Sequence, residues 1–134
     1  TIVTTGIPHL SKLSQKEIKT FVVSGFVKSS TVAVTGKETV NQISKMVFDI
    51  AFIGTNGIHP QAGFTTPEEY EGEVKSMVIE KSKESYILAD SSKFNKLCFV
   101  KFASLDDAKV ITDKKIDNFD YTFIDCIFVG ENNT

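Results

Sequence analysis

The sequence predicts an α/β domain with three layers, in which an open, largely parallel β-sheet carries helices on both faces. Short β-prone segments alternate with segments of helical periodicity along the chain, as in such folds. Residues 49–54 (DIAFIG) and 85–90 (SYILAD) are nearly continuous apolar runs, which are typical of parallel strands covered on both faces. The 134 residues, 41% of them hydrophobic, are enough for one domain with a sizeable core.

The amino-terminal half divides into short β-prone runs that end at glycines, among them Gly6, Gly25 and Gly36. Pro8 favours the first turn of a weak helix. Val40 and Ile43 belong to a stripe of apolar residues at helical spacing. The expected strands are residues 1–5, 19–24, 31–35 and 49–54, and the expected helices are residues 8–16 and 37–47.

The carboxy-terminal half contains a strong signal for a helix start. Thr66 is expected at the N-cap, Pro67 at the first helical position and Glu69 three residues after the cap. Residues 58–64 before it read as a loop. The helix is expected to run to about residue 83, followed by strands at 85–90, 97–103 (antiparallel, at an edge), 109–112 and 122–129, with a short helix between the last two.

The charge pattern argues against direct contact with DNA. The net charge is −2, the isoelectric point is about 5.7, and all 15 basic residues are lysines. A nucleic-acid-binding domain usually carries a basic patch, and arginine is the usual bidentate reader of guanine. The longest apolar run is too short to span a bilayer, so no membrane partner is expected.

Cysteine and histidine are too sparse for a metal site. Cys98 and Cys126 lack the spacing of zinc ligands, and His9 and His59 are the only histidines. We expect two reduced thiols in a cytoplasmic protein, with no metal and no cofactor.

Two corners of the predicted sheet carry polar residues directly after a strand, where ligands of open α/β sheets bind. After the first strand, Gly54 and Gly57 allow a ligand to approach the backbone, and Asn56 offers a hydrogen bond to a hydroxyl. After the second, Asp90 and Lys93 could hold a sugar hydroxyl and a negative group. Alternatively, the glycines form only a tight turn, Asp90 caps a turn and Lys93 is solvated.

A third corner precedes the strong helix start. Gly63, Thr65 and Thr66 would place backbone N–H groups and two hydroxyls at a helix N-terminus, which is an anion-binding arrangement. The alternative is that the threonines only cap the helix. Each corner alone is weak, and their order along one sheet is what suggests a ligand site.

Taken together, these corners resemble a known family. The segments are residues 52–57 (FIGTNG), 63–69 (GFTTPEE), 73–75 (EVK) and 89–94 (ADSSKF). They resemble the C-terminal sugar-phosphate-sensing domain of DeoR-type bacterial transcription repressors, and weaker likeness extends over nearly the whole chain. The combination of the ADSSKF and GFTTP segments makes the resemblance fairly specific.

The resemblance implies a single effector-binding domain over residues 1–134, with a fold similar to ribose-5-phosphate isomerase and the CoA transferases. It implies a repressor of sugar metabolism whose phosphorylated sugar inducer releases operator DNA, and a homo-oligomer. DNA would be bound only through an N-terminal winged helix-turn-helix domain, which is absent from this chain. The family's first sensor strand, with a Gly-Ser/Thr-Thr turn that helps hold the phosphate, is absent too, so Thr65 or Lys75 is expected to assist there.

The isomerase kinship raises an enzyme as the alternative. Such enzymes have acidic residues where this chain has Asn56 and Gly57, and a glutamate base directly before a helix lysine, where Val74 precedes Lys75. Glu73 is one position off, about 100° around the helix. Since proton abstraction needs a base within hydrogen-bond reach, we expect a sensor with no catalytic residues.

Overall fold

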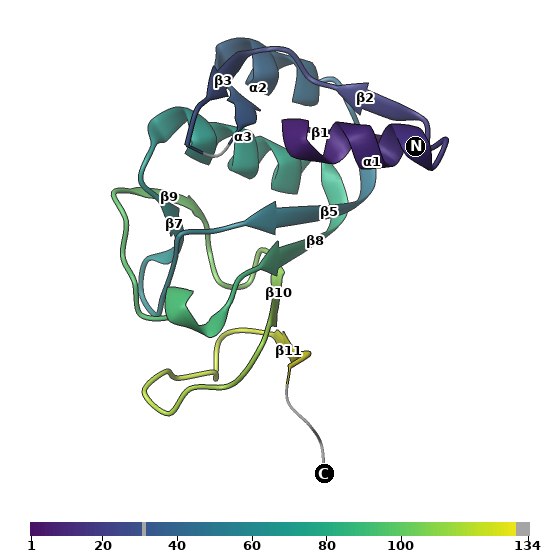
Figure 1. Ribbon diagram of the computed structural model, residues 1–134. Coiled ribbons are helices and arrows are strands. Elements are labelled where there is room, and N and C mark those ends of the chain that lie inside the picture. Colours follow the sequence, from purple (N-terminus) through teal and green to yellow (C-terminus); the bar gives the residue numbers. More distant parts are fainter. Residues whose placement is uncertain (31, 131–134) are drawn as a thin grey trace.

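The computed structural model describes residues 1–30 and 32–130, and its centre is a four-stranded parallel sheet (Figure 1). The strand order is β11-β10-β8-β5, and every neighbouring pair is parallel. The expected parallel α/β sheet is thereby confirmed. Its strands are β5 (Phe48–Gly54), β8 (Ser82–Leu88), β10 (Lys109–Thr112) and β11 (Cys126–Phe128).

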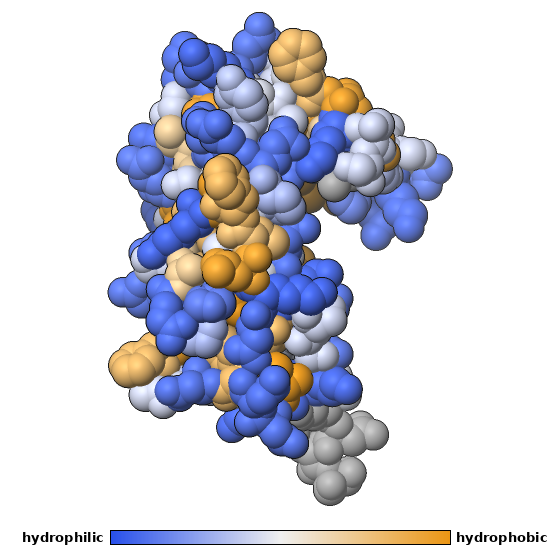
Figure 2. All heavy atoms as spheres, turned by 90° about the vertical axis from the view of Figure 1, so that its left-hand side faces the viewer, coloured by the Kyte–Doolittle hydropathy of each residue, from blue (hydrophilic) through white to orange (hydrophobic). Residues whose placement is uncertain are grey.

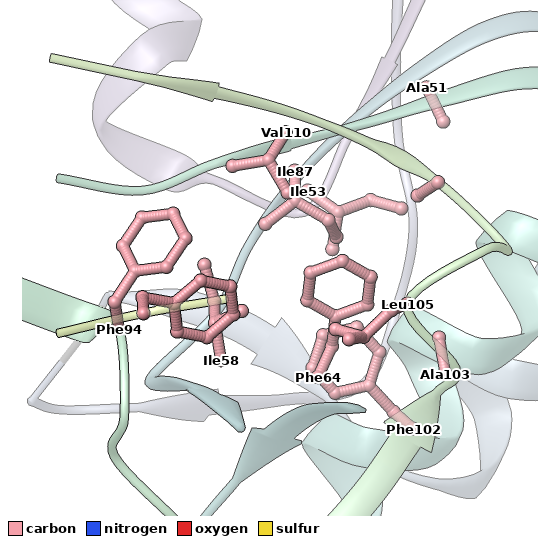
Figure 3. Packing of buried hydrophobic residues seen from close by; sticks show 12 residues of the cluster. Ala51, Ile53, Ile58, Phe64, Ile87, Phe94, Phe102, Ala103, Leu105 and Val110 are labelled. Atoms are coloured by element: carbon pink, nitrogen blue, oxygen red, sulfur yellow. The ribbon is translucent and has the colours of Figure 1, made fainter. Parts of the chain in front are cut away.

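A three-stranded antiparallel sheet covers the inner face of the parallel sheet. It has the order β6-β7-β9, with β6 (Gly57–His59), β7 (Gly63–Thr66) and β9 (Val100–Ala103). Figure 3 shows Ile53, Ile87 and Val110 of the parallel strands facing Phe64 and Ile58 of the hairpin. These five side chains are buried, and they form the centre of the larger hydrophobic core.

The amino-terminal part forms a second layer above the parallel sheet (Figure 1). Two small sheets lie here, one of parallel β1 and β2 and one of antiparallel β3 and β4. Helix α3 contacts α2 on one side and β5, β8 and β9 on the other. The elements are β1 (Ile2–Thr4), a 3-10 turn η1 (Ile7–His9), α1 (Leu10–Gln15), β2 (Thr20–Val22), β3 (Phe26–Lys28), β4 (Ala33–Thr35), α2 (Lys37–Ile43), α3 (Glu69–Glu80) and a second 3-10 turn η2 (Ser91–Lys93).

A second, smaller core joins these amino-terminal elements to α3. Val23, Val34, Ile43 and Val74 are buried together. Val78 of α3 packs against this cluster and also against the larger one. Helix α3 is therefore shared between the two cores.

The outer face of the parallel sheet differs from the expectation of helices on both faces. Ile50, Phe52 and Leu88 point to this face and are exposed, Phe52 at 62%. In the described part of the chain, residues 113–125 contain no helix, so the short helix expected between the last two strands is not formed. The helices that do form leave this face uncovered.

Most expected elements are present with shifted ends. The strand expected at 31–35 corresponds to β4, although residue 31 lies outside the described residues. Strand β9 is antiparallel, as expected, and β10 has the expected bounds. The expected loop at 58–64 is wrong, because these residues build the β6–β7 hairpin. Strand β3 was not anticipated.

The expected helix start at Thr66 is also wrong. Thr66 is the last residue of β7 and pairs with Val100 of β9, and the N-cap of α3 is Glu68. Long-range strand pairing therefore overrides the local capping signal. The first turn keeps Glu69 and Glu71, whose charges suit the positive end of the helix dipole.

Hydrophobic residues on the face drawn in Figure 2 form small, separate patches among hydrophilic ones. Within the described residues, no helix has both the length and the apolar character needed to cross a membrane.

Candidate functional site

Three parallel strands end side by side at the edge of the sheet where the predicted corners lie. Gly54 of β5 pairs with Leu88 of β8, and Leu88 in turn pairs with Ile111 of β10. The segments that follow these strands therefore start at the same edge. The sheet thus brings the corner after β5 and the corner after β8 together, as the sequence predicted, and adds the end of β10.

Asp90 caps the short 3-10 turn η2 after β8. Its Oδ1 accepts hydrogen bonds from the backbone N–H of Ser92, at 2.8 Å, and from the Ser92 hydroxyl. These hydrogen bonds lower the pKa of Asp90, so its carboxylate is ionised at neutral pH. Lys93 ends this turn, half-buried, next to the buried Phe94. Turn capping and ligand binding are compatible, because Asp90 itself stays exposed.

Asp113, just after β10, is a second carboxylate at this edge. Its Oδ1 accepts a 2.7 Å hydrogen bond from the N–H of Ser91. Burial alone would raise the pKa of Asp113, but hydrogen bonds such as that from Ser91 N–H bring it below the usual value. In the sequence analysis Asp113 has no predicted role beyond the edge of the family resemblance, because its proximity to Ser91 depends on the β8–β10 register.

The third corner is placed differently from the expectation. Thr65 and Thr66 are 1% and 0% exposed, and they belong to β7 rather than to a helix N-terminus. The Thr65 oxygen accepts from the N–H of Cys98 at 3.0 Å, while the Thr66 hydroxyl donates to Asn56 Oδ1 at 2.9 Å. The Thr66 bond fixes the Asn56 amide with its oxygen turned inward, which leaves the NH₂ group of this exposed residue as a donor.

The three predicted glycines have different surroundings. Gly54 is exposed, and a Cβ added there would meet no atom within 4 Å, so the backbone is open to an approaching molecule. A Cβ on Gly57 would lie 2.5 Å from the carbonyl oxygen of Lys96. Gly63 is buried and has a φ of +86°, which favours glycine in the turn between β6 and β7. Close packing thus explains why glycine is needed at positions 57 and 63. Gly54 is the one of the three with space around it for a ligand.

Lys75 reaches the same edge from α3. Its Nζ donates a 2.9 Å hydrogen bond to the carbonyl oxygen of Gly54 and lies 5.4 Å from the centre of the Phe102 ring. Burial lowers the pKa of Lys75, while the nearby Glu71 carboxylate opposes that shift. A half-buried ammonium group at a strand end attracts an anion more strongly than a fully solvated one does.

The positions expected to distinguish sensor from enzyme lie on α3 and after β5. Glu73 is exposed, and the buried Val74 stands directly before Lys75. Asn56, where the isomerases carry an acidic residue, is held by Thr66. The carboxylates that the structure does bring to this edge, Asp90 and Asp113, hold backbone N–H groups of the 91–93 turn.

Residues 1–114 match the family model of the DeoR C-terminal sensor domain. A Bacillus subtilis protein named as the uncharacterized HTH-type transcriptional regulator FruR is 41% identical over 111 residues, which cover 83% of this chain and 44% of that protein. The HTH-type transcriptional regulator GlpR of Haloferax volcanii is 32% identical over 84% of this chain and 45% of its own length. The glycerol-3-phosphate regulon repressor of Haemophilus influenzae is 28% identical over 82% of this chain and 43% of its own length.

These matches confirm the resemblance that the sequence motifs suggested. The chain spans less than half the length of each of these three relatives. The relatives are named as transcriptional regulators or repressors, and none of these three names describes an enzyme.

Proposed function

The chain belongs to the family of DeoR C-terminal sensor domains, and from that premise we propose that it binds a phosphorylated sugar or a related phosphorylated metabolite. The ligand would lie at the carboxyl edge of β5, β8 and β10. In the complete protein, its binding would control a repressor of sugar metabolism.

The observation that carries this proposal is the position of Lys75. Its side chain is half-buried, and its ammonium group is hydrogen-bonded to the carbonyl oxygen of Gly54, where the backbone has open space. A phosphomonoester carries a charge of about −1.5 to −2 at neutral pH, so it would gain a charge-assisted hydrogen bond from Lys75. Gly54 would let the phosphate approach closely.

Polar groups at the same edge of the sheet suit the sugar part of such a ligand. Asn56 presents an amide NH₂, Asp90 an ionised carboxylate and Lys93 a second ammonium group. Sugar hydroxyls both donate and accept hydrogen bonds, and this set offers both kinds of partner. The remaining predicted residues would then maintain the shape of this corner. They are Gly57, Gly63, Thr65 and Thr66.

Control of transcription requires that the ligand bind two conformations of the protein with different affinity. The net charge of this chain, −2, does not suit contact with DNA. Operator DNA would therefore be contacted by a part of the protein outside this chain. We propose a homo-oligomer, because paired subunits could present two DNA-binding parts to one operator. The relative named for the glycerol-3-phosphate regulon fits a phosphorylated effector of this kind.

A substitution of Lys75 tests the site. Lys75→Met removes the charge and keeps a long apolar stem, so affinity for a phosphorylated sugar should fall about 10- to 100-fold, the loss of one charge-assisted hydrogen bond. A thermal-shift screen of fructose 1-phosphate, glycerol 3-phosphate and related compounds on the full-length protein first identifies the best-bound probe. Calorimetry with that probe then compares wild type, Lys75→Met and Lys93→Ala.

Lys83→Met serves as the matched control, because this exposed lysine lies at the amino end of β8. Unchanged affinity in both Lys75→Met and Lys93→Ala would contradict the proposed site. The enzyme alternative has its own assay. Steady conversion of an aldose phosphate to a ketose phosphate, abolished by Glu73→Gln, would overturn the sensor function.

A further inference from the structure

We infer that Lys28, on strand β3, is a positioning residue of the ligand site: it neutralises two carboxylates of α3 that would otherwise repel the ligand's phosphate from Lys75. This inference rests on the proposed function. It concerns a residue that lies outside every motif used above and is brought to the site by the β3–β4 hairpin.

The ion pairs of Lys28 are well defined. Its Nζ lies 3.0 Å from Glu68 Oε2 and 3.2 Å from Glu71 Oε1. The side chains of Lys28 and Glu71 are partly buried, at 29% and 13% exposure. Hydrogen bonds to Glu68 and Glu71 raise the pKa of Lys28, which keeps its ammonium group charged.

Glu71 connects this pair to the ligand site. It precedes Lys75 by one helical turn, a spacing that places both side chains on the same face of α3. The Glu71 carboxylate supports the charged form of Lys75, whereas Lys28 opposes it. Lys28 and Lys75 therefore both interact with the Glu71 carboxylate. Lys75 is in turn hydrogen-bonded to Gly54 at the site.

Among the four charged groups that interact here, the charges balance only if Lys28 is included. Lys28 and Lys75 contribute two positive charges, and Glu68 and Glu71 contribute two negative ones. Glu68 is the N-cap of α3, yet its side chain accepts no hydrogen bond from the helix. Its carboxylate instead meets Lys28. Without Lys28, the neighbourhood of Lys75 would be net negative, which is unfavourable for a phosphate.

A purely structural role for Lys28 makes a different prediction. If these ion pairs only fastened the β3–β4 hairpin to α3, removal of the Lys28 charge and removal of the two carboxylates would disturb the site in the same way. If the pair acts by neutralisation, removal of Lys28 weakens phosphate binding, and removal of the carboxylates does not. Variants of opposite charge therefore separate the two roles.

The experiment measures the affinity of the full-length protein for the phosphorylated probe that the thermal-shift screen ranks first. Lys28→Gln should bind it about tenfold more weakly, a loss on the scale of one partly screened charge interaction. Lys28→Arg should restore binding to near the wild-type value. The double variant Glu68→Gln/Glu71→Gln should bind as tightly as wild type or more tightly. Lys83→Gln, which breaks a 3.6 Å pair with Asp49 in an exposed position, is the matched control and should change nothing.

Three results would overturn the inference while leaving the proposed function in place. These are unchanged affinity in Lys28→Gln, an equal loss in Lys28→Gln and Glu68→Gln/Glu71→Gln, and loss of the folded circular dichroism spectrum in Lys28→Gln. The last two would show that the pair is a structural fastening. If wild-type protein binds none of the phosphorylated probes, the proposed function fails, and the role of Lys28 fails with it.

Discussion

The ammonium group of Lys75 holds its place beside Gly54 although burial disfavours its charge. Burial lowers the pKa of Lys75 because the charged form loses hydration. The unfolded chain keeps the ordinary pKa of 10.5. Between the lowered pKa and 10.5, the unfolded state therefore binds more protons, and Lys75 makes the free energy of unfolding rise with pH.

The same shift predicts how ligand binding depends on pH. Above about pH 8 a phosphomonoester is fully ionised, so further changes in affinity report on the protein. Affinity should fall as pH rises through the lowered pKa of Lys75, before the pH reaches 10.5. Calorimetry from pH 8 to 10.5 measures this, with Lys75→Met as the control that should lack the early fall. Parallel profiles for the two proteins would argue against Lys75 as the phosphate partner.

Single residues differ in how far the sequence could identify them. The location of Gly54, Asp90 and Lys93 at the sheet edge was predictable, because each lies at or soon after the end of an apolar strand and the ends of parallel strands share an edge. Lys28 and Asp113 were not, since their partners lie far away in the sequence and depend on how β3 approaches α3 and how β8 pairs with β10.

At the scale of elements, the β6–β7 hairpin shapes the corner behind Asn56. Gly63 ends its turn with a φ of +86°, and a Cβ there would lie 2.4 Å from the carbonyl oxygen of Ala103. His59 supports the same turn, because its Nδ1 accepts hydrogen bonds from the N–H groups of Gln61 and Ala62. The conformation of the hairpin turn is therefore held by Gly63 and by the hydrogen bonds to His59.

Gly63→Ala should destabilise the protein by about 2 kcal/mol or more, because alanine combines an unfavourable φ with a clash against β9. Urea unfolding followed by circular dichroism measures this. Gly54→Ala is the same substitution at a position with open space, and it should leave stability within about 0.5 kcal/mol of wild type. Equal stability of the two variants would disprove the strain at Gly63.

The hairpin also shows why element prediction partly failed. The Thr66-Pro67-Glu68-Glu69 segment carries a good local signal for a helix start, but pairing of Thr66 with Val100 makes it a strand end. Such pairing is non-local and leaves no periodic trace in four residues. Strands β5 and β8 were predictable because their apolar runs are long enough to be read without knowledge of their partners.

At the scale of the whole molecule, the contact between the parallel and antiparallel sheets holds the larger core together (Figure 3). Phe64 is fully buried there, and its ring is stacked 6.2 Å from the Phe102 ring. Its removal would leave a cavity between the sheets. The predicted parallel sheet was correct, but this packing partner was not foreseen, since it is built from the hairpin that read as a loop.

Phe64→Ala should therefore lower the free energy of unfolding by about 3–5 kcal/mol, the usual cost of deleting a buried phenyl ring. Phe123→Ala is the matched control, because Phe123 is 73% exposed and should matter by less than about 0.5 kcal/mol. Chemical denaturation of both variants measures the difference. A small effect at Phe64 would show that the two sheets do not depend on each other for stability.

Helix α3 is packed against both cores through Val78 and carries Lys75, which lies at the proposed ligand site. A shift of α3 would therefore displace groups in both halves of the domain. The amino-terminal layer, with β1, β2 and α2, rests on the opposite side of this helix from the central sheet. If a ligand binds Lys75 as proposed, a displacement of α3 would connect its binding to the amino-terminal layer.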